Sequence, residues 1–162
     1  MRGIRESPES ARCLRELRKQ TFTKPIIGET TLTGQRVIEL AGAAANGALA
    51  HVGLTAEAPI PAVREFRARF EKAYKSLPDH NGIKGYTSVY FLKAGIETAG
   101  KLNRVAVARA LHGLKIRAAK QPGVLMDVAI DDHGDLDRAS FIVEVKDGKQ
   151  VVKEVLPPVA KF

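Results

Sequence analysis

Apolar residues in the first third of the chain recur first at helical and then at extended spacing. Ala11, Leu14 and Leu17 fall on one face of a helix, with Arg and Lys side chains between them. The predicted elements, in order, are a helix from Ser7, a strand at 24–28, a helix at 33–41 capped by Thr33, and a strand at 47–53. This helix–strand–helix–strand order is typical of an α/β protein with a mostly parallel sheet.

The middle of the chain is predicted to be helical and the last third extended. Helices are expected at 62–77, at 83–99 and from Asn103 to Gly113, and strands at 125–130, 140–146 and 151–155. Apolar residues cover more than half the circumference of the 83–99 helix, which predicts that this helix is heavily buried. Asp147 and Gly148 are a two-residue turn signal, so the last two strands are expected to form a hairpin.

Composition and charge describe an ordinary folded chain with a basic surface. The 162 residues are 44% hydrophobic and 27% charged, close to globular usage, and the formal net charge is +8. Residues 101–120 carry six basic and no acidic side chains, so a basic nucleic-acid-binding domain is one alternative function. The basic residues coincide with predicted amphipathic helices and few aromatic residues lie among them, which favours solvated helix faces over a nucleic-acid surface.

No combination of residues in the sequence forms a recognisable reaction centre. Cys13 is the single cysteine, expected to be packed or half-buried, and the four histidines are not spaced as metal-binding pairs. Residues 131–137 are rich in Asp but lack the Gly and Glu spacing of an EF-hand, so they are interpreted as an acidic turn between two strands. The sequence shows neither a glycine-rich phosphate loop nor a nucleophile elbow. It therefore indicates a binding protein rather than an enzyme, with no metal or cofactor.

The collinear order of several stretches gives the most specific signal in the chain. The stretches are Arg15–Gln20, Phe22–Gly28, Leu40–Gly47, Pro78–Tyr86, Gly134–Arg138 and Lys146–Val152. Together they resemble the periplasmic amino-acid-binding proteins of branched-chain amino-acid ABC transporters. The resemblance implies a type I periplasmic-binding fold, in which two α/β lobes joined by hinge segments close over a small ligand. It also implies that the membrane subunits of the transporter are partners of the full-length protein.

The resemblance further implies that the fold is incomplete and contains only the C-terminal portions of both lobes. Residues 1–9 are unlike the family and form an atypical N-terminal segment. The implied parts are the end of one lobe with a hinge-crossing strand at 10–53, part of the other lobe at 54–137, and a C-terminal hairpin at 138–162 that returns across the hinge. The family resemblance implies a periplasmic location, whereas the sequence as given shows no signal peptide and would remain cytoplasmic.

Ligand contacts are implied by the resemblance at two places. In the loop after the first strand, the Glu29 carboxylate would pair with the ammonium group of a ligand, and Thr30 and Thr31 would hydrogen-bond to it. Tyr86 stands where an aromatic residue of the family lines the cleft. The residues alone leave other interpretations open: Glu29 as a loop charge, Thr31 or Thr33 as a helix cap, and Tyr86 as a core aromatic.

An incomplete fold has two expected consequences. The chain by itself should bind its amino-acid or related organic-acid ligand weakly or not at all, because the opposing wall of the cleft is missing. Strands 24–28 and 47–53 would normally pair with strands encoded upstream, so unpaired edges and exposed apolar surface are expected. Self-association as a homodimer or larger assembly would cover this surface.

Overall fold

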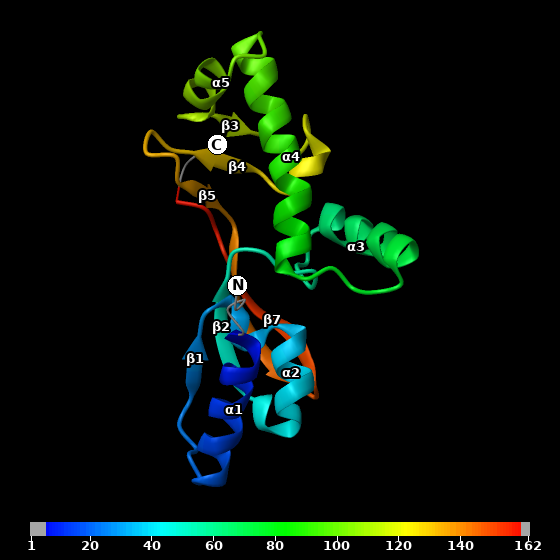
Figure 1. The fold of residues 1–162 in the computed structure, drawn as a ribbon, viewed down its shortest axis with the longest axis vertical. Coiled ribbons are helices and arrows are strands. Elements are labelled where there is room, and N and C mark those ends of the chain that lie inside the picture. Colours follow the sequence, from blue (N-terminus) through cyan, green and yellow to red (C-terminus); the bar gives the residue numbers. More distant parts are fainter. Residues whose placement is uncertain (1–5, 160–162) are drawn as a thin grey trace, which may run out of the picture.

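The computed structural model describes residues 6–159, which form two parts arranged along the long axis of the molecule (Figure 1). The four-stranded part contains residues 6–52 and 140–156, and the three-stranded part contains residues 61–138. The helices are α1 (Glu6–Lys19), α2 (Gln35–Ala41), α3 (Pro61–Tyr74), α4 (His80–Ala99) and α5 (Arg104–Leu111), with 3-10 turns η1 (Thr30–Thr33), η2 (Gly42–Ala45) and η3 (Pro122–Val124). The strands are β1 (Ile26–Gly28), β2 (Ala48–Val52), β3 (Lys115–Ile116), β4 (Val128–Ile130), β5 (Leu136–Arg138), β6 (Ser140–Lys146) and β7 (Lys149–Leu156).

The larger sheet has the strand order β1-β2-β6-β7. β1 and β2 pair in parallel, whereas the β2–β6 and β6–β7 pairs are antiparallel. The expectation of a mostly parallel sheet is therefore wrong for the described residues. The turn between β6 and β7, where Asp147 and Gly148 have φ angles of 50° and 72°, makes this pair antiparallel, as the turn signal predicted. The antiparallel pairing of β6 with β2 joins distant segments, and the local alternation of helices and strands does not predict it.

Helices α1 and α2 pack together on this sheet, and apolar side chains from both helices form its core. The buried members of this core are Ala11, Leu14, Val37, Ile38, Ala41, Ala45, Ala48 and Val145. The predicted apolar face of α1 is thus confirmed at Ala11 and Leu14. The thiol of Cys13 is exposed, so the expectation of a packed cysteine is wrong; the preceding position on a helix points about 100° away from Leu14.

The starts of the first two helices differ from the predicted ones. α1 begins at Glu6, so Ser7 lies inside the helix, and residues 1–5 of the expected atypical segment lie outside the described residues. α2 begins at Gln35, with Gly34 at its N-cap and no side-chain cap. The expected Thr33 cap is therefore wrong: Thr33 ends η1, is fully buried, and accepts a hydrogen bond from the side chain of Gln150.

The smaller sheet has the order β3-β4-β5 and is antiparallel throughout. Its core joins α4, η3 and the strands through Ala94, Ile116, Val124 and Val128. The strand predicted at 125–130 begins only at Val128, because Leu125 leaves η3 in a left-handed conformation with φ of 67°. Residues 131–135 connect β4 to β5, so the predicted turn at 131–137 is confirmed as far as Asp135. Leu136 and Asp137 belong to β5, a strand that the sequence did not predict.

Helix α4 is longer and less buried than predicted. It begins at His80, where the carboxylate of Asp79 accepts a 2.7 Å hydrogen bond from the Gly82 N–H. The side chains of Val89 and Leu92 are 65% and 52% exposed. The expectation of heavy burial is wrong because α5 and η3 cover one face of the helix, and the opposite face is open to solvent. Neither α4 nor any other helix in residues 6–159 carries an apolar stretch sufficient to cross a bilayer.

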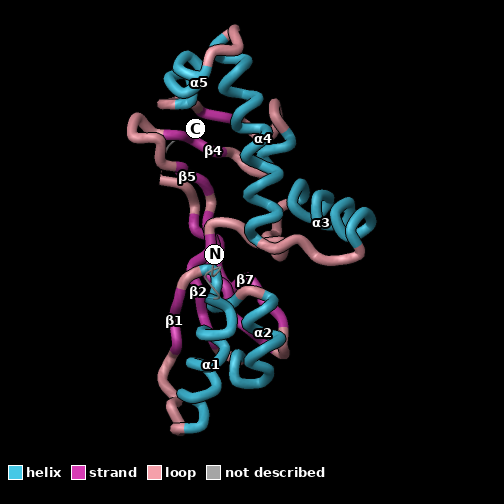
Figure 2. The backbone as a smooth tube through the Cα atoms, in the orientation of Figure 1, coloured by secondary structure: helices cyan, strands magenta, loops and turns pink. Residues whose placement is uncertain are grey.

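Chain crossings, which can be followed in Figure 2, and a shared core connect the two parts. Residues 53–60 lead from β2 to α3, and Ala139 leads from β5 to β6. After β7, the Val159 N–H donates to Asp137 at 3.1 Å and so returns the chain to β5. The shared core contains buried residues of both parts: Ala50, Val52, Leu54, Ala58, Val63, Phe66, Ile83, Leu125, Met126, Phe141 and Val143. The junction is therefore packed rather than a bare linker.

Candidate ligand-binding site

The loop that follows β1 is held by the side chain of Glu29. One carboxylate oxygen of Glu29 accepts a 2.9 Å hydrogen bond from the backbone N–H of Thr31 and caps η1. Glu29 is exposed and takes part in none of the ion pairs found within residues 6–159. Thr30 and Thr31 are half-buried members of the same turn. The loop therefore presents an exposed carboxylate, followed in the chain by two half-buried threonine residues.

Gln150 fixes the end of this loop, a role that the sequence did not reveal. Its amide nitrogen donates to both the carbonyl and the hydroxyl oxygen of Thr33, each at 2.9 Å. Its amide oxygen accepts a hydrogen bond from the hydroxyl of Thr55 in the crossing segment. Thr55 also accepts from the Glu57 N–H at 3.1 Å. One side chain on β7 thus ties the η1 turn to the chain that leads to α3.

Tyr86 lies in the other part of the molecule, on the second turn of α4. Its ring packs against Phe66 of α3 with centroids 4.5 Å apart, and its hydroxyl donates to the Tyr90 hydroxyl at 3.4 Å. The hydrogen bond to Tyr90, together with burial, raises the pKa of Tyr86 above its ordinary value. Tyr86 is half-buried rather than an enclosed core residue.

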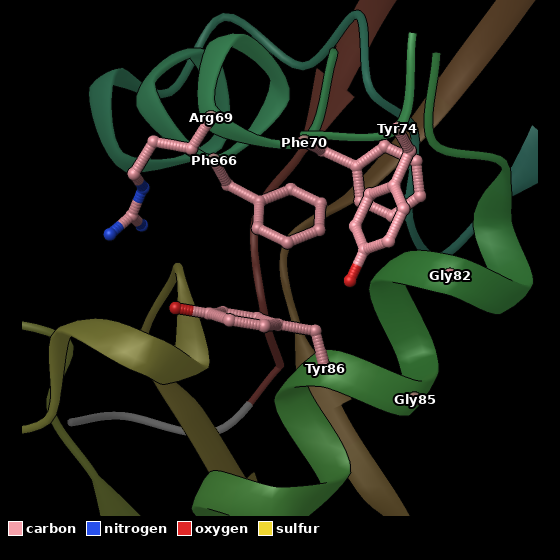
Figure 3. A pocket seen from close by; sticks show the side chains of 7 residues that line it. All are labelled: Phe66, Arg69, Phe70, Tyr74, Gly82, Gly85 and Tyr86. Atoms are coloured by element: carbon pink, nitrogen blue, oxygen red, sulfur yellow. The ribbon is translucent and has the colours of Figure 1, made fainter. Parts of the chain in front are cut away.

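An open groove of about 510 Å³ lies between α3 and α4 (Figure 3). The residues that line it are Phe66, Arg69, Phe70, Tyr74, Gly82, Gly85 and Tyr86. Phe66, Phe70 and Tyr74 recur every four residues along α3, and this spacing is the signal that could have identified one wall of the groove from the sequence. The structure therefore places Tyr86 in an aromatic groove, and Glu29, Thr30 and Thr31 in the four-stranded part.

The acidic turn before β5 is held by its own backbone. One carboxylate oxygen of Asp131 accepts hydrogen bonds from the N–H groups of His133 (2.8 Å) and Asp135 (2.9 Å). These bonds, that of Asp135 above all, hold the pKa of Asp131 below its ordinary value. No group of three or more His, Cys, Asp or Glu side chains within the described chain is arranged to hold a metal ion.

Comparison with known proteins gives a family and a set of similar solved structures. A profile described as "periplasmic binding protein" matches residues 7–150. A leucine-binding protein from Thermotoga maritima superposes with a TM-score of 0.77 and 25% identity, over 94% of this chain and 43% of its own. A benzoate-bound ABC-transporter solute-binding protein from R. palustris superposes with a TM-score of 0.75 and 21% identity, over 94% of this chain and 41% of its own. A branched-chain amino-acid transporter substrate-binding protein from Streptococcus pneumoniae, in complex with isoleucine, superposes with a TM-score of 0.73 and 18% identity. The match covers 94% of this chain and 42% of that protein. Among curated proteins there was no match.

These findings define a solute-binding class of protein with a partial α/β fold of the type I periplasmic-binding kind. The chain belongs to the periplasmic binding protein family, because the profile covers most of its residues. The resemblance inferred from the collinear stretches is thereby confirmed, and so is the expectation of a non-enzymatic protein, since this family is non-enzymatic. The chain spans about two fifths of the length of these solved relatives, which confirms an incomplete fold.

Proposed function

We propose that this chain takes part in recognition of an amino acid or a related organic acid, as a solute-binding protein of an ABC transporter does. The observation that carries the proposal is the superposition of 94% of the chain on a leucine-binding protein. The same fraction of the chain superposes on an isoleucine-bound and a benzoate-bound protein, so the proposal includes both amino acids and aromatic acids as ligands. The membrane subunits of a transporter would be the partners of the complete protein, in the periplasm.

The loop after β1 would supply the polar contacts. The carboxylate of the exposed Glu29 would pair with a ligand ammonium group, and the hydroxyls of Thr30 and Thr31 would hydrogen-bond to the ligand. Tyr86 would contact the ligand from the three-stranded part. A ligand held from both parts favours the conformation in which they are closest, because its affinity differs between the open and closed states.

The parts of the structure would correspond to the two lobes of the family. Residues 10–53 would form the end of one lobe, residues 54–137 part of the other, and residues 138–162 a hairpin that returns to the first. The support for this assignment is the pairing of β6 with β2, which joins the C-terminal hairpin to the sheet of residues 26–52.

We expect weak ligand binding, or none, by this chain alone, because the matched structures contain more than half of their length outside the region it covers. Calorimetric titration with leucine, isoleucine and phenylalanine measures this. Ligand binding that shifts the amide NMR signals of residues 29–31, and that Glu29→Gln weakens, would support the proposed function. Micromolar affinity would contradict the expected weakness. Ligand binding that shifts other amide signals but not those of residues 29–31, or that Glu29→Gln leaves unchanged, would contradict the proposed contacts.

Self-association is the second part of the proposal. β2 is flanked by β1 and β6, so the expected free edge of strand 47–53 is absent, but the outer edge of β1 is unpaired in the described sheet. Ile27 on this edge is 72% exposed, and Val89 and Leu92 of α4 add exposed apolar area. A homodimer or larger assembly would cover these surfaces. Light scattering tests it: Ile27→Lys should lower the measured mass, whereas a wild-type monomer would contradict the proposal.

A further inference from the structure

The groove between α3 and α4 has the geometry of a site for a flat aromatic group. The Phe70 and Tyr74 rings have centroids 4.6 Å apart, and the Phe66 and Phe70 rings 5.8 Å. The three ring pairs that line the groove are tilted by 44–49°, so the rings are not stacked face to face. Figure 3 shows Phe66, Phe70 and Tyr74 on the α3 side and Tyr86 on the α4 side of one hollow. Tilted rings at such distances attract a further aromatic ring.

The floor of the groove leaves room for this ring. Gly82 and Gly85 are the lining residues from α4 besides Tyr86, and neither carries a side chain that could fill the space. A Cβ atom at position 85 would meet no heavy atom within 4 Å. The volume of about 510 Å³ lies in the range of small-molecule sites, roughly 300–1,000 Å³.

Arg69 gives the groove its charge. It is the single charged residue that lines the groove, and it forms no ion pair with an acidic side chain within residues 6–159. Figure 3 shows the guanidinium at the same end of the groove as the Tyr86 hydroxyl. The Arg69 guanidinium favours a carboxylate, which can accept hydrogen bonds from its N–H groups. The proton of the nearby Tyr86 hydroxyl is donated to Tyr90, so Arg69 supplies the donors at this end. A cationic group would be repelled at this end.

We infer that the α3–α4 groove binds an aromatic carboxylate, with the ring among Phe66, Phe70, Tyr74 and Tyr86 and the carboxylate on Arg69. The inference rests on the proposed function and narrows the ligand class from amino acids and organic acids in general. An aliphatic amino acid fits this groove less well, because it has no ring face to offer and its ammonium group would lie near Arg69.

Benzoate is the probe for this inference, and three related compounds separate its components. Cyclohexanecarboxylate keeps the charge without the aromatic ring, benzamide keeps the ring without the charge, and leucine tests the loop at Glu29. Binding is followed by ligand-observed saturation-transfer NMR and by amide shifts of the protein. The variants are Arg69→Gln and Tyr74→Leu, with Arg64→Gln as the matched control, since Arg64 is an exposed arginine of the same helix outside the groove.

Benzoate should bind with at least about tenfold higher affinity than cyclohexanecarboxylate or benzamide, and Arg69→Gln should weaken it about tenfold. Tyr74→Leu should weaken it several-fold, whereas Arg64→Gln should have no effect. Equal binding of benzamide, or equal loss in Arg64→Gln, would overturn the inference, as would the absence of any benzoate signal at millimolar concentration. A leucine response at residues 29–31 without a benzoate response would reject the groove and leave the proposed function standing.

Discussion

Gln150 does more for the candidate loop than its sequence position suggests. It lies on β7, at the far end of the chain from the Glu29 loop, and is bonded to the buried Thr33 and to Thr55. These hydrogen bonds form only when β7, the η1 turn and the segment that leads to α3 have come together. They therefore stabilise the tertiary structure and not an individual helix or strand. The Gln150 amide thus fixes the end of the η1 turn, whereas Glu29 caps its start.

Replacing Gln150 with Ala should lower the free energy of unfolding by about 1–3 kcal/mol, because buried hydroxyl and carbonyl groups of Thr33 and Thr55 lose their partner. Urea denaturation followed by circular dichroism measures the change. Gln35→Ala is the control, since the Gln35 amide makes one exposed 3.3 Å contact with Glu39. Equal effects of both substitutions would show that the buried amide has no special role.

The hydrogen bonds to Asp131 predict a pH dependence with a defined sign. Because the pKa of this carboxyl is lowered in the folded protein, its contribution to stability is complete above the unfolded pKa of about 3.9. That contribution is lost as the pH falls through the lower, folded pKa. In an NMR titration the amide signals of His133 and Asp135 should shift at this lower pH, and Asp131→Asn should abolish the shift. Asp132→Asn, which leaves both amide bonds intact, should preserve it.

The candidate residues show what sequence reasoning reaches and where it stops. Local rules identified the acidic turn, because Asp131 bonds to residues two and four positions away. They did not identify Gln150 or assign the buried Thr33, because the partners of these residues are 117 positions apart. The roles of Glu29, Thr30, Thr31 and Tyr86 in ligand binding stay predictions. The structure shows only that Glu29 caps a turn and that Tyr86 lines a groove.

Helices α4 and α5 pack through a glycine. A Cβ atom at Gly95 would lie 2.9 Å from Cδ2 and 3.0 Å from Cγ of Leu111, closer than carbon atoms normally approach. This contact lets α5 lie close to α4 and forms the side of α4 that is buried. At Gly85, almost three turns earlier, an added Cβ atom would meet no heavy atom within 4 Å, so this residue offers a matched position in the same helix.

Gly95→Ala should destabilise the protein by about 1–3 kcal/mol, because the added methyl group forces the helices apart or pushes Leu111 out of its rotamer. Gly85→Ala should instead stabilise it by about 1 kcal/mol, because Ala has the higher helix propensity and nothing obstructs it. Thermal unfolding of the two variants measures both changes. A stabilising Gly95→Ala would mean that the helix contact adjusts without strain.

Most elements were predictable from the sequence, whereas their pairing was not. Hydrophobic spacing and caps located α3, α4 and α5, and Asn103 caps α5 through a 3.0 Å bond from the Ala106 N–H, as predicted. Strand direction depends on how distant segments meet, so the alternation of helices and strands suggested parallel pairs that only β1 and β2 form. The sequence also did not predict the exposure of Val89 and Leu92, because the spacing of apolar residues does not show which other elements cover a helix face.

The packed junction predicts that the two parts unfold together. Phe141 is fully buried in the shared core, among residues of β2, α3 and α4. Phe141→Ala should destabilise the whole molecule by about 3–5 kcal/mol, because it leaves a large cavity. A dye on Cys13, the single and exposed cysteine, reports on α1, and far-UV circular dichroism reports on all helices. The unfolding curves from the dye and from circular dichroism should coincide, and both should shift equally in Phe141→Ala. Separate midpoints would show that the parts are independent.

The aromatic groove also determines the tyrosine fluorescence of the protein. The protein has no tryptophan and three tyrosines, Tyr74, Tyr86 and Tyr90. The first two line the groove, and the third lies 5.1 Å from Tyr86, ring centroid to ring centroid. The tyrosine fluorescence of the protein therefore comes from this one place. An unlabelled sample reports on the groove through its own tyrosine emission, because residues 6–52 and 140–156 of the four-stranded part contain no tyrosine.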